Sequence, residues 1–436
     1  MDNKKNIIQY AIMGIFILFI VIAVLIFSGA IKIGSSTPKG VSGSVTMWGT
    51  ISKSSISELL ADFNEQNKDY TVNYIQVDPS NYESSLIDAL ASGAGPDIFM
   101  MPDDFIWKHF NKIYPIPYER ITVRDYVDRY IDGVSIFRAP TAIFALPFTV
   151  DPLVMYYNRD LVSAAFYDKP PETWDGYYKF AFETTKRNED QTIETSAIAF
   201  GAYDNILHAK DILSMLFLQT GNGITYFNGN TLDTDISVVP VGGNDPLTQS
   251  ALVFYTDFAN PATDFYSWNR SLNTDYDMFV SGKLAVYFGY ASEVFGIRAR
   301  NPNLNFDVAV VPQIKDSVSQ VTYAKYTGLA VSKQSKNPAT AILVAEQMAG
   351  RDFQEKLTEI TRLPPVHKAL LVADPVDPYD GIFKKSAFIS KSWIDPNPAS
   401  TSTAYETLIE DVLSGRMSVA DAINDFVSTL ESIIAK

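Results

Sequence analysis

Short strand-like segments alternate with amphipathic helical segments along much of the chain, and this alternation constrains the fold more than any other feature. Residues 45–48 and 97–101 are mostly apolar and predict strands. Apolar residues between positions 56 and 63 recur at helical spacing and predict a helix. The spacing of Ser55 and Glu58 predicts a capping box at the start of this helix. With a second strand and helix in between, the order is β-α-β-α-β. It predicts a parallel sheet covered by helices, with ligands binding at the carboxyl ends of its strands.

A second α/β series follows residues 145–158, an extended segment that contains Pro147 and Pro152 and predicts a crossing between two lobes. The following part predicts helices at 174–186 and 211–219, strands at 196–200, 284–288, 306–311 and 328–331, a hairpin at Asn228-Gly229, and two closing helices, the second behind a Ser418 cap. We therefore expect a two-lobe α/β fold.

The N-terminus carries an apolar run that is long enough to cross a membrane. Ile7 to Phe27 is broken only by Gln9, Tyr10 and Gly14, and a helix of this length spans roughly 30 Å of hydrocarbon. The preceding lysines at positions 4 and 5 favour a cytoplasmic N-terminus. We expect a single-pass transmembrane anchor over residues 7–30, with residues 1–6 in the cytoplasm and the globular part extracytoplasmic.

A cleaved signal peptide is the alternative, because Ser28-Gly29-Ala30 offers small residues to a signal peptidase. The apolar run is longer than the roughly 7–15 residues usual for a signal peptide, which favours the uncleaved anchor. The chain has no cysteine, so it holds neither a lipid on an N-terminal cysteine nor a disulfide. Residues 31–43, rich in Gly, Ser and Thr, predict a flexible linker.

Charge and motif content exclude several classes of function. The formal net charge is −15, with acidic residues spread along the chain, so nucleic acid is not an expected partner. The chain lacks the motifs of phosphate-binding loops, serine hydrolases and zinc proteases. His109, His208 and His367 lie far apart with no ligand spacing. We expect no metal and no cofactor.

Short stretches in a fixed order resemble family 1 extracellular solute-binding proteins, the group that contains maltose-binding protein, over most of residues 44–372. The stretches that carry the resemblance are Trp48-Gly49, residues 92–98, residues 153–161, residues 171–174, residues 279–286 before Gly289, and residues 331–337. The resemblance implies two lobes of the periplasmic-binding-protein fold, type II-like, that close by a hinge over a solute. It also implies delivery to an ABC permease with its ATPase, and we expect a monomer.

The resemblance and the crossing segment together predict the division of the chain. The first lobe is expected to comprise residues 44–149 and 319–372, and the second residues 150–318, with the C-terminal helices of residues 373–436 mainly in the second lobe.

Four candidate ligand-binding residues lie in the first part of the chain. Trp48 ends the first strand, where its indole can stack on a sugar ring, although a core position is the alternative. Asp103 and Asp104 follow the strand 97–101, and carboxylates there accept hydrogen bonds from hydroxyl or amine groups; a solvated loop is the alternative for Asp103. By the resemblance, Asp104 falls where the family has its sugar-binding Asp, and Tyr157 matches a Tyr that touches sugar, with hinge packing as its alternative.

Two later aromatic residues, Tyr290 after Gly289 and Trp393, are further candidates for the cleft, whereas Trp107 and Trp174 sit in helical patterns and predict packing. Met101 stands where the maltose-binding branch has Trp, so the ligand surface differs from that of a maltodextrin binder. Aromatic and acidic residues together suit a carbohydrate, which we expect as the solute, but also a polyamine or another cation.

Three functions remain open from the sequence. The expected one is a membrane-anchored solute-binding protein of an ABC importer, which is not an enzyme. The alternatives are a membrane-anchored glycoside hydrolase, whose paired carboxylates would converge from distant positions, and a sensing or adhesion subunit on the same fold.

Overall fold

The computed structural model describes residues 41–190, 192–229, 231–237, 239, 246–375 and 377–435. The predicted membrane segment at residues 7–30 lies outside these residues. No helix in the described part of the chain is long and apolar enough to span a bilayer.

The strands are β1 (Gly43–Gly49), β2 (Tyr70–Gln76), β3 (Ile98–Pro102), β4 (Ile116–Pro117), β5 (Ala142–Ile143), β6 (Leu146–Asn158), β7 (Lys186–Arg187), β8 (Ile193–Ile198), β9 (Tyr226–Asn228), β10 (Thr231–Asp233), β11 (Leu284–Tyr290), β12 (Phe306–Ala309), β13 (Thr322–Val331) and β14 (Ser390–Lys391).

The α-helices are α2 (Lys53–Gln66), α3 (Tyr82–Ala91), α4 (Ile106–His109), α5 (Val123–Arg129), α6 (Arg159–Ala164), α7 (Tyr177–Thr184), α8 (Ala209–Gln219), α9 (Leu247–Asp257), α10 (Asp275–Val280), α11 (Val294–Arg300), α12 (Pro338–Met348), α13 (Arg351–Thr361), α14 (Lys368–Leu371), α15 (Asp380–Phe388), α16 (Pro398–Leu413) and α17 (Val419–Ile434). The 3-10 helices are η1 (Pro79–Asn81), η2 (Asp103–Phe105), η3 (Phe110–Lys112), η4 (Asp132–Phe137), η5 (Trp174–Gly176) and η6 (Ala291–Glu293).

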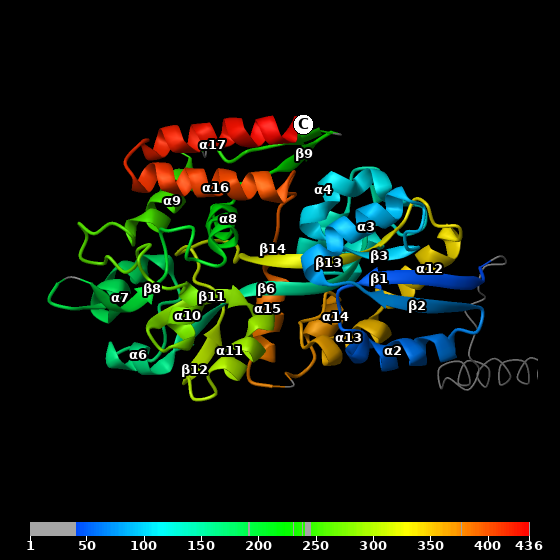
Figure 1. Ribbon diagram of the computed structural model, residues 1–436, viewed down its shortest axis with the longest axis horizontal. Coiled ribbons are helices and arrows are strands. Elements are labelled where there is room, and N and C mark those ends of the chain that lie inside the picture. The colour runs from blue at the N-terminus through cyan, green and yellow to red at the C-terminus, as the bar shows by residue number, and fades with distance from the viewer. Residues whose placement is uncertain are drawn as a thin grey trace, which may run out of the picture. The chain divides into compact units, whose positions relative to one another are not determined.

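Two groups of strands are joined by the long strands β6 and β13, in the order β2-β1-β3-β13-β6-β11-β8-β7 (Figure 1). In the first lobe β1 runs parallel to β2 and β3, and helices α2, α3, α12 and α13 lie around these strands. In the second lobe β8 runs parallel to β11, among helices α7 to α11, with α16 and α17 beyond them. The two-lobe α/β fold and the parallel pairing within each lobe follow the prediction.

Strand β6 carries the crossing between the lobes, and its prolines mark where its partners change. Its first half pairs antiparallel with β13, and its second half pairs with β11 and β12. Proline cannot donate a ladder hydrogen bond, so it fits where pairing is interrupted. Pro152 is the last residue of β6 paired with β13, and Pro147 lies opposite a register shift between Thr327 and Gly328.

One predicted cap is wrong and another is confirmed. Helix α2 begins at Lys53, before the predicted capping residue Ser55, and the Ser52 position shows no side-chain cap. The Gln76 side chain, from the end of β2, instead accepts a hydrogen bond from the Lys53 amide (2.8 Å). A contact across the fold therefore replaces the local one. At α17, Ser418 accepts from the Asp421 amide as expected (3.1 Å).

The core of the second lobe is built largely from aromatic side chains, and Trp174 packs within it as predicted. Its ring contacts Tyr177, Phe200, Phe254 and Phe288. Its indole N–H donates to the buried Gln219 side chain (2.6 Å), which in turn donates to the carbonyl groups of Pro312 and Val321, just before β13. The core of the second lobe therefore holds the start of the shared strand β13 in place.

Candidate functional site: the acidic cleft between the lobes

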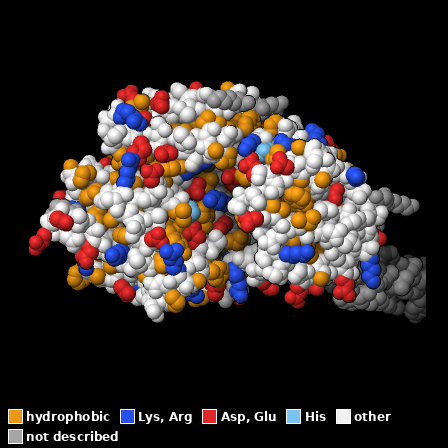
Figure 2. All heavy atoms as spheres, viewed as in Figure 1, with side chains coloured by type: hydrophobic (Ala, Val, Ile, Leu, Met, Phe, Trp, Pro, Cys, Tyr) orange, Lys and Arg blue, Asp and Glu red, His pale blue; other side chains and the backbone are white. Residues whose placement is uncertain are grey.

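The carboxyl ends of strands from both lobes face the same region. Strands β1 and β3 run toward the crossing and end at Gly49 and Pro102, and β11 runs toward it from the other lobe and ends at Tyr290, which pairs with Leu153. Figure 2 shows a hollow between the two lobes where acidic and basic side chains gather. We refer to this hollow as the cleft.

Asp103 and Asp104 enter the cleft from the first lobe, directly after β3 in η2. Asp103 is buried, and its carboxylate accepts a hydrogen bond from the Ser392 hydroxyl in the C-terminal segment (2.5 Å). Asp104 is partly buried. Burial, and then the neighbouring Asp104, raise the pKa of Asp103; burial, and then Asp395, raise the pKa of Asp104. These carboxyl groups thus lie in a region that already holds an excess of negative charge.

On the second-lobe side of the cleft, Tyr290 and Asp211 form a hydrogen-bonded pair. The Tyr290 hydroxyl donates to Asp211 Oδ2 (2.6 Å), and the Tyr290 side chain is almost fully buried. Asp211 lies in the first turn of α8. The carboxylate of this pair provides a hydrogen-bond acceptor on the second-lobe side of the cleft.

Lys325, in the middle of the shared strand β13, lies among carboxylates from both lobes. Its ammonium is 3.6 Å from Asp211 Oδ2 and 4.4 Å from the centre of the Tyr290 ring. Burial lowers the pKa of Lys325, but Asp211, Asp104 and Asp103 raise it by more, so that the net shift is upward. Its side chain is still 54% exposed. The charged group is therefore both stabilised by the cleft and accessible from it.

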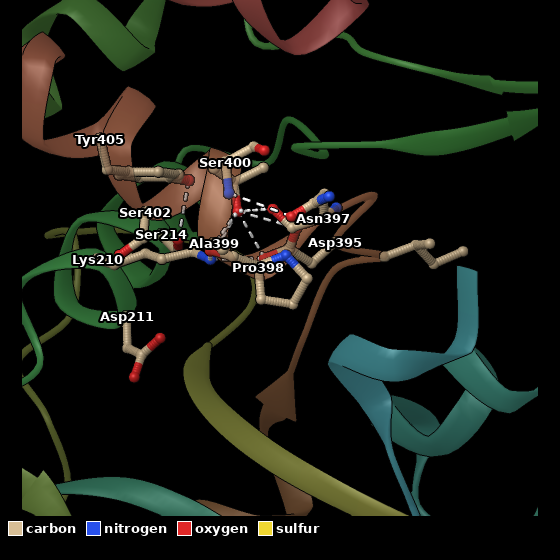
Figure 3. A network of polar contacts seen from close by, with 12 residues as sticks. Lys210, Asp211, Ser214, Asp395, Asn397, Pro398, Ala399, Ser400, Ser402 and Tyr405 are labelled. Carbon is tan, nitrogen blue, oxygen red and sulfur yellow. Dashed lines mark hydrogen bonds and ion pairs between the residues drawn. The ribbon is translucent and has the colours of Figure 1, made fainter. Parts of the chain in front are cut away.

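A second lysine fixes the C-terminal wall of the cleft (Figure 3). Lys210 donates to Asp395 Oδ2 (2.5 Å) and to Thr401 (2.8 Å), and its ammonium lies 5.4 Å from the centre of the buried Trp393 ring. Asp395 also accepts from Thr401 (2.9 Å). Figure 3 shows that Asp211, the next residue after Lys210, points away from this network. Adjacent residues of α8 thus serve two separate networks.

The structure brings four of the six predicted residues, Asp103, Asp104, Tyr290 and Trp393, into this connected region. Trp48 lies at the end of β1 with its ring partly exposed, and its carbonyl accepts from the Tyr82 hydroxyl (3.3 Å). Tyr157 lies four residues beyond Leu153 on β6, and its hydroxyl donates to Asp307 (3.2 Å). Tyr157 is therefore not part of the charged network.

Comparison with known protein families identifies the family to which the chain belongs. The family model described as bacterial extracellular solute-binding protein matches residues 58–380. The chain belongs to this family. Its members bind solutes, so the chain is a binding protein rather than an enzyme, and its globular part is extracytoplasmic.

Curated relatives and solved structures agree with the family and the fold. The galactooligosaccharide-binding protein of Bacillus subtilis is 23% identical over 92% of both chains, and the maltodextrin-binding protein MdxE of the same organism is 22% identical over 88% of both. The crystal structure of a cyclo/maltodextrin-binding protein complexed with maltotetraose has a TM-score of 0.73 and 17% identity, covering 91% of this chain and 98% of that one. The chain thus has the two-lobe fold of these solute-binding proteins.

Sequence reasoning missed Asp211, Lys210, Lys325, Asp395 and Asp151. A signal existed for Asp211, because α8 follows the carboxyl end of β8 in the second lobe, just as Asp104 follows the carboxyl end of β3 in the first. Lys325 is placed by its register opposite Asp151 on β6, which no local pattern reveals. Asp395 lies two residues after the predicted Trp393, but its partner Lys210 is far from it in sequence.

Asp151 gives a pH-dependent test of the buried acidic region. Burial raises its pKa to about 6, although the Ser292 backbone N–H donates to it (3.1 Å). The pKa of an Asp in the unfolded chain is about 3.9, so the folded state binds the Asp151 proton more tightly than the unfolded state. The contribution of this proton to the free energy of unfolding is therefore fully present below about pH 3.9 and is lost as the pH rises through about 6. Asn at this position keeps an acceptor for Ser292 and does not titrate.

We therefore expect Asp151→Asn to gain stability relative to the wild type as the pH rises from 4 to 7, measured as the free energy of unfolding in urea at each pH. An Asp151→Asn difference that is flat across this range would contradict the assignment.

Proposed function

We propose that this solute-binding protein holds a carbohydrate in the cleft and delivers it to an ABC permease with its ATPase. The observation that carries the proposal is the meeting of Asp104 from the first lobe, Asp211 and Tyr290 from the second, and Lys325 from the strand they share. A solute between these groups would contact both lobes at once.

The chemistry of these groups suits a polyol. Carboxylates accept hydrogen bonds from sugar hydroxyls, an ammonium group donates to them, and aromatic rings cover the apolar C–H faces of a sugar. We propose Asp104, Asp211, Lys325, Tyr290 and Trp393 as the principal contacts. Trp48, Asp103 and Tyr157 stay predicted contacts.

The relatives support a carbohydrate over other solutes. Their names or titles specify galactooligosaccharide, maltodextrin, maltotetraose, tagatose, acarbose and mannobiose. The surplus of carboxylates over lysines in the cleft favours the polyamine alternative, so a polyamine belongs in the test.

Closure follows from the way the groups are distributed. We propose that residues 44–149 with 319–372, and residues 150–318 with the C-terminal helices of 373–436, move as two lobes about β6 and β13. Contacts from both sides can be satisfied together only when the lobes approach, so a solute binds the closed form better and shifts the population toward it.

We further propose that residues 7–30 anchor the protein in the membrane as a single helix, with residues 1–6 in the cytoplasm and residues 31–43 as a linker. The proposal rests on the length and composition of the apolar run. We expect a monomeric receptor that stays near its permease because both are in the same membrane.

The binding prediction uses the full chain in detergent and a panel of maltotetraose, a galactooligosaccharide, mannobiose, tagatose and spermidine. We expect one of the sugars to give saturable heat in calorimetry and to raise the melting temperature in proportion to the logarithm of its concentration. The bound sugar should be recovered intact by chromatography. Steady cleavage would favour the glycosidase alternative, and binding of spermidine alone would favour the polyamine.

The anchor prediction concerns the native N-terminus. Intact mass spectrometry of protein extracted from membranes should show a chain that begins at Met1 or Asp2, and the protein should stay with the membrane fraction in high salt. A mature chain beginning at Ile31 would show that the segment is a cleaved signal peptide.

A further inference from the structure

A buried polar chain lies behind Asp211 and Tyr290 in the second lobe. His208 Nε2 lies 2.6 Å from Glu293 Oε1, and His208 Nδ1 lies 4.0 Å from Asp211 Oδ2. The Tyr287 hydroxyl donates to Glu293 Oε2 (2.5 Å). The side chains of His208 and Glu293 are only 11% and 18% exposed. The chain thus runs from the interior of the lobe to the wall of the cleft.

Glu293 connects the two elements that carry the cleft residues. It accepts from the Tyr290 backbone N–H (3.0 Å) at the end of β11 and from His208, which lies directly before α8. Burial raises the pKa of Glu293, but the hydrogen bonds from His208, Tyr287 and the Tyr290 backbone, together with the charge of His208, lower it by more. The net shift is downward, which keeps Glu293 ionised as an acceptor.

The arrangement leaves one oxygen of Asp211 for the solute. The Tyr290 hydroxyl, the Lys325 ammonium and His208 Nδ1 all approach Oδ2. Among the described residues, no hydrogen bond engages Oδ1. An ionised carboxylate has about four acceptor positions, so Oδ1 can accept from a solute hydroxyl while Oδ2 is held.

We propose that His208 and Glu293 are positioning residues, which fix the Asp211 carboxylate and the Tyr290 ring for the solute without touching it. The inference rests on the proposed function for its binding readout. The His208 ring meets the Tyr290 ring edge-on, with centroids 4.8 Å apart. Its Nδ1 is 4.0 Å from Asp211 Oδ2, beyond hydrogen-bond distance, so His208 acts on Asp211 through the Tyr290 ring whose hydroxyl binds Asp211. Losing a hydrogen bond to a buried charged group typically corresponds to about a 10-fold to 100-fold change in an equilibrium constant.

The chain provides a matched control for a purely structural role. His109 is also buried, and its Nε2 lies 2.8 Å from Glu83 Oε1 in the first lobe. The hydrogen-bonding partners of His109 are Glu83 and Lys112, which are not cleft residues. His109→Leu therefore removes the same kind of buried pair without disturbing Asp211 or Tyr290.

The first test needs no ligand and uses crystal structures of the full chain carrying His208→Leu or His208→Gln. In His208→Leu we expect the Tyr290 ring to shift and its hydroxyl to leave Asp211 Oδ2, because Tyr290 loses the ring packed against it and Glu293 loses a hydrogen-bond donor. In His208→Gln the side-chain amide can still donate to Glu293. The hydrogen bond from the Tyr290 hydroxyl to Asp211 Oδ2 (2.6 Å in the wild type) should therefore remain. An unchanged Asp211–Tyr290 pair in His208→Leu would overturn the proposal.

The second test measures the affinity of the same variants for maltotetraose and the galactooligosaccharide by calorimetry. We expect His208→Leu to weaken binding about 10-fold to 100-fold, His208→Gln to bind nearly as tightly as the wild type, and His109→Leu to bind like the wild type. In a Tyr290→Phe background the effect of His208→Leu should shrink, since both act on Asp211.

Equal affinity losses in the His208→Leu and His109→Leu variants would show a general structural effect and would overturn the proposal. If the wild type binds neither sugar, the carbohydrate assignment fails for these probes, while the ligand-free structures still decide the positioning role.

Discussion

The site depends on the position of one ammonium group, Lys325, on a strand that both lobes share. β13 pairs with β3 of the first lobe from Thr327 onward, and Lys325 itself pairs with Asp151 on β6, so the position of Lys325 is fixed by a strand that is bonded to both lobes. The neighbouring carboxylates of Asp103 and Asp104 belong to the first lobe, and Asp211 belongs to the second. Because like charges at this density would repel, a cation at the centre allows acidic groups from both lobes to face one cleft.

Some polar residues around Lys325 have their hydrogen bonds satisfied within the protein, and others have exposed or unbonded atoms that can bind a solute. The Lys210–Asp395–Thr401 network is buried and satisfied within itself, so it stiffens the wall near Trp393. Lys325 is half exposed, and Asp211 has one oxygen engaged by its neighbours. Rigid surroundings with a few adjustable groups lower the entropy cost of ordering the site on binding.

The sequence predicted the elements of the fold better than the composition of the site. Hydrophobic periodicity and strand-end reasoning are local, which is why the two α/β series and the positions of Asp104 and Tyr290 could be predicted. Lys325 could not, because its place depends on the register of β13 against β6, and the first half of β13 was not predicted as a strand. Asp395 and Ser392 reach the cleft from the C-terminal segment through tertiary contacts alone.

The measurement that tests the account most directly is the distance between the lobes with and without solute. The chain has no cysteine, so Ser84→Cys on α3 and Thr403→Cys on α16, both exposed in the described structure, would carry two spin labels on the full chain without background labelling. Double electron–electron resonance should show a shorter, narrower distance distribution with the sugar that binds in calorimetry. A distribution that is unchanged when that sugar is bound would contradict binding by closure of the two lobes.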